Sequence, residues 1–268
     1  MALWDKIGSV GNVEDRRGAG LALGGGTVIV GIIAYLVLGF LGVEIDPAIL
    51  NQVLNSTQTT SQSSEFAGTD DYERFASSVL GSTNDYWRQE FTRQGRGFDD
   101  PTLVLFRSAT QSGCGVATSQ VGPHYCPTDK TIYLDETFFT VLRDQLGGSS
   151  DDVAQAYVIA HEAGHHAQDL LGILGSSGSS PSDSVRTELQ ADCFAGLWAN
   201  SLRDSGVFEP GEIKEAIDAA AAVGDDRIQK TTTGSINPET WTHGSSEQRV
   251  NAFNTGYDTG NFSECSKL

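Results

Sequence analysis

His161, Glu162 and His165 have the types and spacing that can bind a metal ion and use it in hydrolysis, in the pattern His-Glu-x-x-His. On a helix, residues four positions apart share one face, so both imidazoles can reach the same ion. Glu162 lies beside them and can take a proton from a zinc-activated water while the metal polarises a scissile carbonyl. The pattern predicts one Zn²⁺ per chain and a hydrolase, a metalloprotease that cleaves peptide or protein substrates.

A catalytic zinc ion needs a third protein ligand and an open coordination position. One class of zinc peptidases places a third histidine six residues after the second, but Leu171 occupies that position here, and the only methionine is Met1. The other common third ligand is a glutamate on a following helix, and Glu188 supplies it. Asp192, four residues later, shares that helix face and can accept a hydrogen bond from a zinc-bound histidine. The alternative is that both carboxylates are solvated helix charges.

His243 and Arg249 lie where a loop enters a predicted helix. His243 can donate a hydrogen bond to the oxyanion that develops when a peptide carbonyl is attacked. Arg249 can orient that histidine or pair with Asp192, and a capping or surface role for His243 is the alternative. His166 points elsewhere on its helix than the two candidate ligands, which favours packing or hydrogen bonding. His124 is expected to be structural or to contact substrate.

Two other functions fit the same residues. A catalytically weak zinc-binding scaffold would use the fold for interaction, and an amidase acting on cell-wall peptides would keep the same site. The presence of Glu162 favours an enzyme, because a structural zinc site is closed by four ligands and has no use for a general base.

Hydrophobic spacing and capping residues predict the elements that position these side chains. They indicate an α+β fold that is mainly helical with a small β-sheet. Ser149 and Ser150 are candidate caps for the helix that carries His161, and Ser245 with Gln248 can form a capping box for the last helix. A Gly/Ser-rich loop is expected over 172–184. The predicted helices are 71–87, 138–146, 151–171, 185–204, 210–223 and 246–257, and the predicted strands are 102–106 and 131–135.

The first part of the chain predicts membrane attachment. No charged side chain occurs between Arg17 and Glu44, and the 26 residues of 18–43 exceed the roughly 20 that cross a bilayer as a helix. Lys6, Arg16 and Arg17 before the stretch favour an N-terminus in the cytoplasm. A cleaved signal peptide is the alternative, although the stretch is long and no clear cleavage site follows it. The predicted divisions are a cytoplasmic tail (1–17), a transmembrane helix (18–43), a linker or stalk (44–68) and an extracytoplasmic domain (69–268).

The amino-acid composition argues against nucleic acid as a partner, and the cysteines indicate a location outside the cytoplasm. The formal charge of −18, from 35 acidic and 17 basic residues, argues against nucleic acid, because phosphate binding needs clustered cations. Four cysteines permit two disulfides outside the cytoplasm. Cys114 and Cys126 bracket a short loop and are the natural pair, and Cys193 with Cys265 would then tie the last residues to a helix. One local bridge with two buried thiols is the alternative.

Several motifs together resemble the bacterial putative neutral zinc metallopeptidases. The resemblance implies one N-terminal span and a zincin-like domain, with zinc on His161, His165 and Glu188 and catalysis by Glu162. The segment from His243 also resembles the His-x-x-x-x-x-Arg element of membrane-bound gluzincins, which supports a transition-state role for His243. As in zincins, the strand at 131–135 is expected to form the sheet edge to which an extended peptide adds. The motifs are VEDRRG (13–18), CG (114–115), GPHYCPTDKTIYLD (122–135), HEAGHHAQ (161–168), ELQADCFAGLWA (188–199) and HGSSEQRV (243–250).

Overall fold

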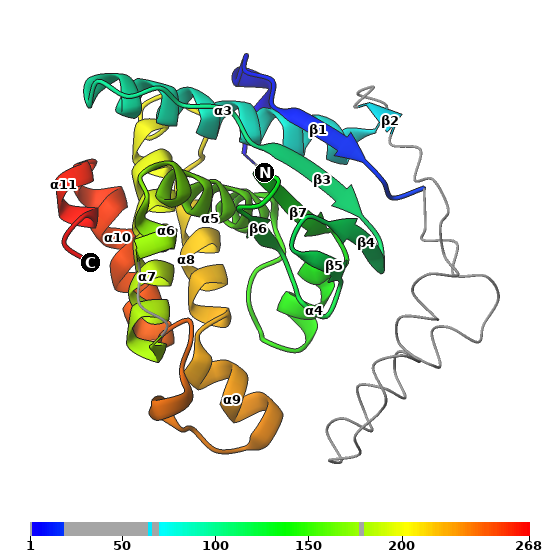
Figure 1. The fold of residues 1–268 in the computed structure, drawn as a ribbon, viewed down its shortest axis with the longest axis vertical. Helices are drawn as coiled ribbons and strands as arrows, with labels where there is room; N and C mark the ends of the chain where they lie inside the picture. The colour runs from blue at the N-terminus through cyan, green and yellow to red at the C-terminus, as the bar shows by residue number, and fades with distance from the viewer. Residues whose placement is uncertain (1, 19–63, 66–69, 177–179) are drawn as a thin grey trace.

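A five-stranded sheet and a group of helices make up the part of the chain that the computed structural model describes, which is residues 2–18, 64–65, 70–176 and 180–268 (Figure 1). This architecture confirms the predicted mixed α+β class. The helices are α3 (Asp71–Arg93), α4 (Phe138–Asp144), α5 (Asp152–Leu170), α6 (Ile173–Ser176), α7 (Pro181–Ser201), α8 (Ile213–Ala222), α9 (Asp225–Thr233), α10 (Ser246–Thr259) and α11 (Phe262–Cys265), with short 3-10 turns η1 (Trp4–Lys6) and η2 (Pro238–Thr240).

The sheet has the order β2-β1-β3-β7-β6, with β1–β3 and β3–β7 parallel and both outer pairs antiparallel. A separate hairpin, β4–β5, covers one face. In β3, Leu103 and Leu105 join the main core while Val104 and Phe106 pack beneath the hairpin, so both faces are buried. This explains the unbroken apolar run of that strand. The strands are β1 (Asn12–Asp15), β2 (Ser64–Glu65), β3 (Thr102–Phe106), β4 (Ala109–Ser112), β5 (Gly115–Thr118), β6 (His124–Cys126) and β7 (Thr131–Asp135).

The first residues of the chain belong to this folded unit and do not form the separate tail that was predicted for 1–17. β1 lies inside the sheet beside β3, and Val13 is only 1% exposed. The Trp4 ring stacks parallel to Trp198 of α7 at 6.5 Å, and its indole N–H donates to the Asp152 carboxylate at 2.7 Å. The N-terminal segment therefore contacts the sheet, α7 and the first residue of α5.

Helix α5 lies at the centre of the helical layer, where it packs against α3, α7 and α8 (Figure 1). Its first residue is Asp152, and the cap residue is Asp151 instead of the predicted Ser149 or Ser150. Ser149 instead donates its hydroxyl hydrogen to the Asp151 carboxylate at 3.0 Å. The helix therefore starts at two acidic residues, Asp151 and Asp152, whose negative charge suits the positive end of the helix dipole.

Helices α7 and α10 cross with almost no side chain between them. A Cβ added at Gly196 would lie 2.1 Å from the Phe253 carbonyl oxygen, and one added at Gly256 would lie 2.0 Å from the Cys193 carbonyl oxygen. A disulfide between Cys193 and Cys265, with sulfurs 2.00 Å apart, fixes the C-terminal turn beside this crossing. The crossing therefore sets how far side chains from α10 reach across α7.

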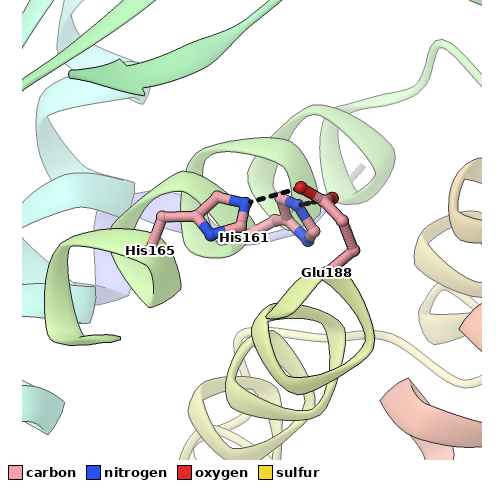
Figure 2. Close-up of side chains that lie close together, drawn as sticks. All are labelled: His161, His165 and Glu188. Carbon is pink, nitrogen blue, oxygen red and sulfur yellow. Dashed lines mark hydrogen bonds and ion pairs between the residues drawn. The ribbon is translucent and has the colours of Figure 1, made fainter. Parts of the chain in front are cut away.

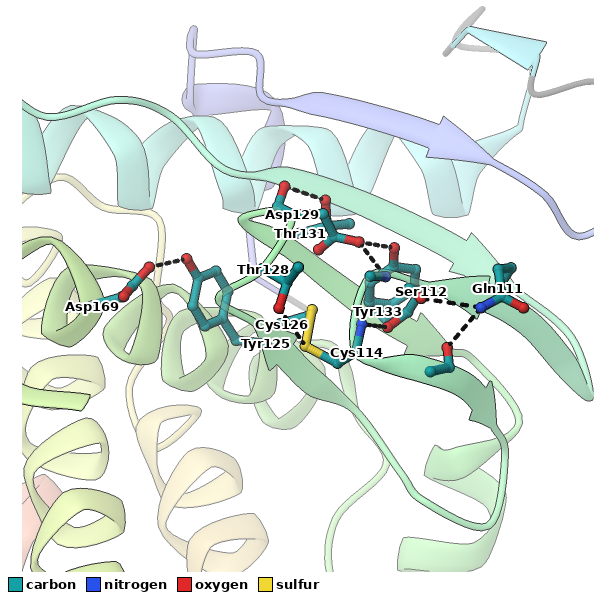
Figure 3. Close-up of a disulfide and its surroundings, with 12 residues drawn as sticks. Gln111, Ser112, Cys114, Tyr125, Cys126, Thr128, Asp129, Thr131, Tyr133 and Asp169 are labelled. Atoms are coloured by element: carbon teal, nitrogen blue, oxygen red, sulfur yellow. Dashed lines mark hydrogen bonds between the residues drawn. A yellow bond between two sulfur atoms is a disulfide. The ribbon is translucent and has the colours of Figure 1, made fainter. Parts of the chain in front are cut away.

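The second disulfide, between Cys114 and Cys126, joins the turn of the β4–β5 hairpin to the outer strand β6 (Figure 3). Next to it, the Tyr125 hydroxyl donates to the Asp169 carboxylate near the end of α5 at 2.8 Å (Figure 3). Both predicted disulfide pairs are thus present. Together these contacts hold the hairpin and β6 against the central helix.

Two expectations about the elements differ from the structure, and a third is confirmed. Strand β7 hydrogen-bonds to β3 on one side and to β6 on the other, so the edge role predicted for 131–135 is wrong and β6 is the outer strand. Helix α7 begins at Pro181, because Ser180 and Asp183 form a capping box inside the segment that was predicted to be a loop. The capping box of Ser245 and Gln248 on α10 is present as predicted.

Apart from Gly18, the predicted span 18–43 lies outside the described residues, as does most of the predicted stalk 44–68. Among the helices within the described ranges, none combines the length and apolar content needed to cross a membrane.

The helix crossing gives a stability prediction. Gly256→Ala forces a methyl group against the Cys193 carbonyl, so α7 and α10 must separate, and we expect the free energy of unfolding to fall by about 2 kcal/mol or more. Gly97→Ala is the matched control, because a Cβ there meets nothing within 4 Å. Chemical denaturation of both variants is the measurement, and equal stability of the two would show that the crossing is not close.

Candidate metal centre

Three side chains from two helices converge on one point (Figure 2). His161 and His165 lie one turn apart on α5, and Glu188 lies on α7. The Glu188 carboxylate lies 3.2 Å from Nε2 of His161 through one oxygen and 3.4 Å from Nε2 of His165 through the other. One ligand atom from each residue falls within 4.8 Å of the others, the only such group of three among the described residues.

The dimensions of this group fit a zinc ion. Zinc bonds to histidine nitrogen and carboxylate oxygen are about 2.0–2.2 Å long, so ligand atoms at two corners of a tetrahedron lie about 3.4 Å apart. The two nitrogen–oxygen separations of 3.2 and 3.4 Å match that value. Two imidazoles and one carboxylate also form a donor set typical of catalytic zinc, which leaves one position for water or substrate.

His161 is oriented by a buried group of polar side chains. Its Nδ1 lies 2.9 Å from Oδ1 of Asp192, which is fully buried. Because a carboxylate can only accept, Nδ1 carries the hydrogen and Nε2 presents its lone pair to the metal position. Arg249 of α10 forms a double hydrogen bond to the same carboxylate, at 2.8 and 2.9 Å, and the Tyr157 hydroxyl also donates to it. Three helices therefore fix one ring.

His165 is oriented by an amide instead of a carboxylate. Its Nδ1 donates to Oε1 of Gln168 at 2.8 Å, one turn later on α5. The Gln168 amide nitrogen in turn donates to the Thr187 carbonyl at 2.8 Å and to Gln190 at 3.0 Å. The second ring thus also presents Nε2 to the metal position, and Gln168 ties it to the helix that carries Glu188.

Buried charges around the candidate metal centre shift the pKa values of His161 and Glu188. Burial disfavours the charged imidazole of His161, but the carboxylates of Asp192 and Glu188 outweigh burial and raise its pKa to about 10. Burial likewise opposes the charged form of Glu188, but His165 and His161 hold its pKa well below the usual value. In the metal-free protein the cluster therefore carries a proton that a divalent cation must displace, so metal affinity rises with pH.

Glu162 follows His161 in α5 and has one carboxylate oxygen that accepts no hydrogen bond. Only 6% of the residue is exposed, and its Oε2 atom makes no hydrogen bond in the structure. A buried carboxylate oxygen without a partner is costly, which is typical of a functional position. Glu162 also lines the same cavity as the three candidate ligands. The carboxylate is therefore in place to act on a molecule that enters this cavity.

The cavity has a volume of about 570 Å³, and His243 forms part of its wall. Nδ1 of His243 lies 3.2 Å from Asp225, the first residue of α9. The other oxygen of that carboxylate accepts the backbone N–H groups of Thr242, His243 and Gly244 at 2.6–2.9 Å. Asp225 thus shapes the loop and occupies Nδ1 of His243, so Nε2 is the ring nitrogen that is left for the cavity, and it is a donor when the imidazole is protonated on both nitrogens.

The sequence prediction missed three residues that orient these groups: Tyr157, Gln168 and Asp225. Tyr157 and Gln168 lie one helical turn from a candidate ligand, so the 3.6-residue period was a signal that could have found them. Asp225 lies eighteen positions before His243, and no local pattern links the two.

The other two histidines, His166 and His124, lie outside the group of three candidate ligands. His166 is buried, with its ring nitrogens 2.9 Å from the Tyr125 hydroxyl and 2.6 Å from the Asp99 carbonyl oxygen, so it is no ligand. His124 stacks on Tyr133 and also lines the cavity.

Comparison with known proteins assigns this arrangement to a family. The profile of the family described as "Putative neutral zinc metallopeptidase" matches residues 2–268. The chain belongs to this family. The match includes both the N-terminal segment and the metal cluster, so the family pattern extends over nearly the whole chain.

Relatives of the metallopeptidase family occur in distant bacteria. The uncharacterized protein YpfJ of Escherichia coli (strain K12) is 41% identical over 274 aligned positions, which cover 95% of this chain and 94% of that protein. The uncharacterized proteins Rv2575 of Mycobacterium tuberculosis and Mb2605 of Mycobacterium bovis are 50% identical over 183 positions, which cover 63% of this chain. No solved structure matches the chain.

Asp192 gives a test of the metal centre. Asp192→Asn keeps the shape but removes the charge that orients His161 and neutralises Arg249, so we expect zinc affinity to fall about 10–100-fold. Competition with a chromophoric chelator at pH 7 measures this affinity. Asp204→Asn, an exposed change, is the control. Equal affinity in the two variants would contradict the orienting role.

Proposed function

We propose that this protein is a zinc-dependent peptidase that hydrolyses peptide bonds with Glu162 as the general base. The observation that carries the proposal is the convergence of His161, His165 and Glu188 beside the partnerless carboxylate oxygen of Glu162. A structural zinc site would have four protein ligands and no adjacent base. The family description, a neutral zinc metallopeptidase, supports the same reaction class.

His161, His165 and Glu188 would hold the zinc ion. When bound, the ion lowers the pKa of a water molecule and polarises a carbonyl oxygen. Glu162 accepts the proton of the attacking water and passes it to the leaving amine. Tyr157, Asp192 and Arg249 keep the ring of His161 fixed during these transfers.

His243 would stabilise the negative charge that develops on the carbonyl oxygen. Asp225 accepts from its Nδ1–H, so the imidazolium form of His243 has a second donor, Nε2–H, whose direction is set by the loop and not by side-chain rotation. A donor that is oriented before the reaction costs no reorganisation when the charge forms, which makes it more effective than a mobile one.

An extended substrate would lie along β6. This strand is the outer strand of the sheet, and residues 122–125 line the cavity. Within the described part of the chain its second edge pairs with no strand, so a peptide can add there by backbone hydrogen bonds. The cavity wall is mostly apolar, with Phe138, Leu146 and Val158 among its residues, and this favours apolar substrate side chains.

The peptidase would act outside the cytoplasm while attached to the membrane through the apolar residues of 18–43. Two disulfides support this location, because such bonds persist in oxidising compartments. The apolar stretch is long enough to enter a bilayer, and membrane attachment remains a prediction from the sequence.

Replacement of Glu162 tests the proposed function. Glu162→Gln keeps the shape but removes the proton acceptor, so we expect casein hydrolysis to fall at least 100-fold while zinc stays near one ion per chain. Metal analysis and fluorogenic casein cleavage are the measurements. If the variant and the wild type cleave equally, the protein is not this kind of enzyme, and a binding role for the zinc site becomes the better account.

His243 has a separate kinetic signature. We expect His243→Ala to lower kcat about 100–1,000-fold with little change in KM or zinc content, because the lost hydrogen bond forms mainly in the transition state. His124→Ala is the matched control, since it removes another histidine from the same cavity wall, and its kcat should change less than tenfold. A drop confined to KM for His243→Ala would assign that histidine to substrate binding.

A further inference from the structure

We infer that the first 17 residues lie on the same side of the membrane as the catalytic domain. This replaces the arrangement that the sequence predicts, in which a single span separates a cytoplasmic tail from the domain. The inference depends on contacts of described residues on both sides of the apolar stretch.

Strand β1 is an internal strand of the catalytic domain's sheet. It pairs with β3 in parallel over four residues, from Asn12 opposite Thr102 to Asp15 opposite Leu105. Val13 is buried in the main core, and Gly11 packs so tightly on α3 that an added Cβ would lie 2.6 Å from Leu80. Moving these residues across a membrane would expose an edge of β3 and open the core beneath it.

The chain also leaves and re-enters the domain at one place. Asp15 at the end of β1 is the antiparallel partner of Ser64 at the start of β2. Residues 19–63, whatever path they take, therefore begin and end at the same corner of the sheet. A path that crosses the bilayer once cannot join two such neighbours.

Arg17 fixes this corner by ion pairs. Its guanidinium lies 2.9 Å from the carboxylates of Asp15 and Glu136 and 2.5 Å from that of Asp70, and its side chain is only 7% exposed. Asp70 caps α3 and Glu136 follows β7, so two of the three partners come from beyond the apolar stretch. Arg17 and its neighbour Arg16 are two of the three basic residues that favoured a cytoplasmic N-terminus, and both are paired inside the fold.

The other end of the segment is equally fixed. The backbone N–H of Ala2 donates to Asp152 at 2.8 Å, and the Trp4 ring lies among Phe75, Trp198 and Phe208. Removal of this segment by a signal peptidase would therefore take an internal strand and an aromatic anchor from the domain. The geometry favours a chain that keeps both flanks of the apolar stretch on one side of the membrane.

Thiol labelling in intact cells tests the inference on the full chain. Val10→Cys and Ile236→Cys each place one exposed thiol, in the N-terminal segment and in the domain, because the native residues are 73% and 49% exposed. The native cysteines are in disulfides, so only the new thiol reacts. A membrane-impermeant maleimide applied before and after lysis reports the side. We expect both thiols to be labelled from the same side, and labelling from opposite sides would overturn the inference.

Cross-linking tests the same arrangement without reference to compartments. Asn12 and Thr102 are register partners with side chains 2.9 Å apart, so a short bismaleimide should join Asn12→Cys to Thr102→Cys in membranes. Digestion and mass spectrometry detect the joined peptides. Asn12→Cys with Ile236→Cys is the control that should not cross-link. Absence of the Asn12–Thr102 product in protein that retains its zinc would refute the pairing.

Discussion

The carboxylate of Asp192 is the interaction on which the rest of the centre depends. It is fully buried, and it faces a histidine from α5, a tyrosine from the same helix and an arginine from α10. A buried carboxylate of this kind is favourable only when its charge and all its acceptor sites are matched. The close crossing of α7 and α10 brings Arg249 within hydrogen-bonding distance of Asp192. The packing of these two helices and the orientation of His161 therefore depend on each other.

The sequence predicted the local parts of this constraint well. Strands 102–106 and 131–135 and the capping box at Ser245 were read correctly, because each depends on neighbouring residues. The two histidines were predicted from their four-residue spacing and Glu188 as a glutamate on the following helix, and the structure brings the three side chains together. The position of β7 inside the sheet and the link from Asp225 to His243 could not be predicted, since both arise from contacts between distant segments. β1 was missed because it is only four residues long and mostly polar, and its position just before a long apolar stretch suggested a tail outside the domain.

The N-terminal segment does more than add a strand to the sheet. Besides extending the sheet, the segment contacts Asp152, where α5 begins, and stacks on Trp198 in α7. The two helices that carry the candidate metal ligands are thus both contacted by residues that precede the apolar stretch. Family similarity from residue 2 onward agrees with an integral role for this segment.

The bond from Cys193 to Cys265 has a consequence for the order of folding. Cys193 lies one residue from Asp192, but its partner Cys265 lies 72 residues later and is therefore made later. The arginine that neutralises the buried carboxylate is also late in the chain. During synthesis the two histidines and the glutamate therefore emerge well before the groups that orient and lock them. A nascent chain would therefore carry the candidate metal ligands before the side chains that orient them, and the complete centre would form only after Arg249 and Cys265 have been made and the disulfide has closed.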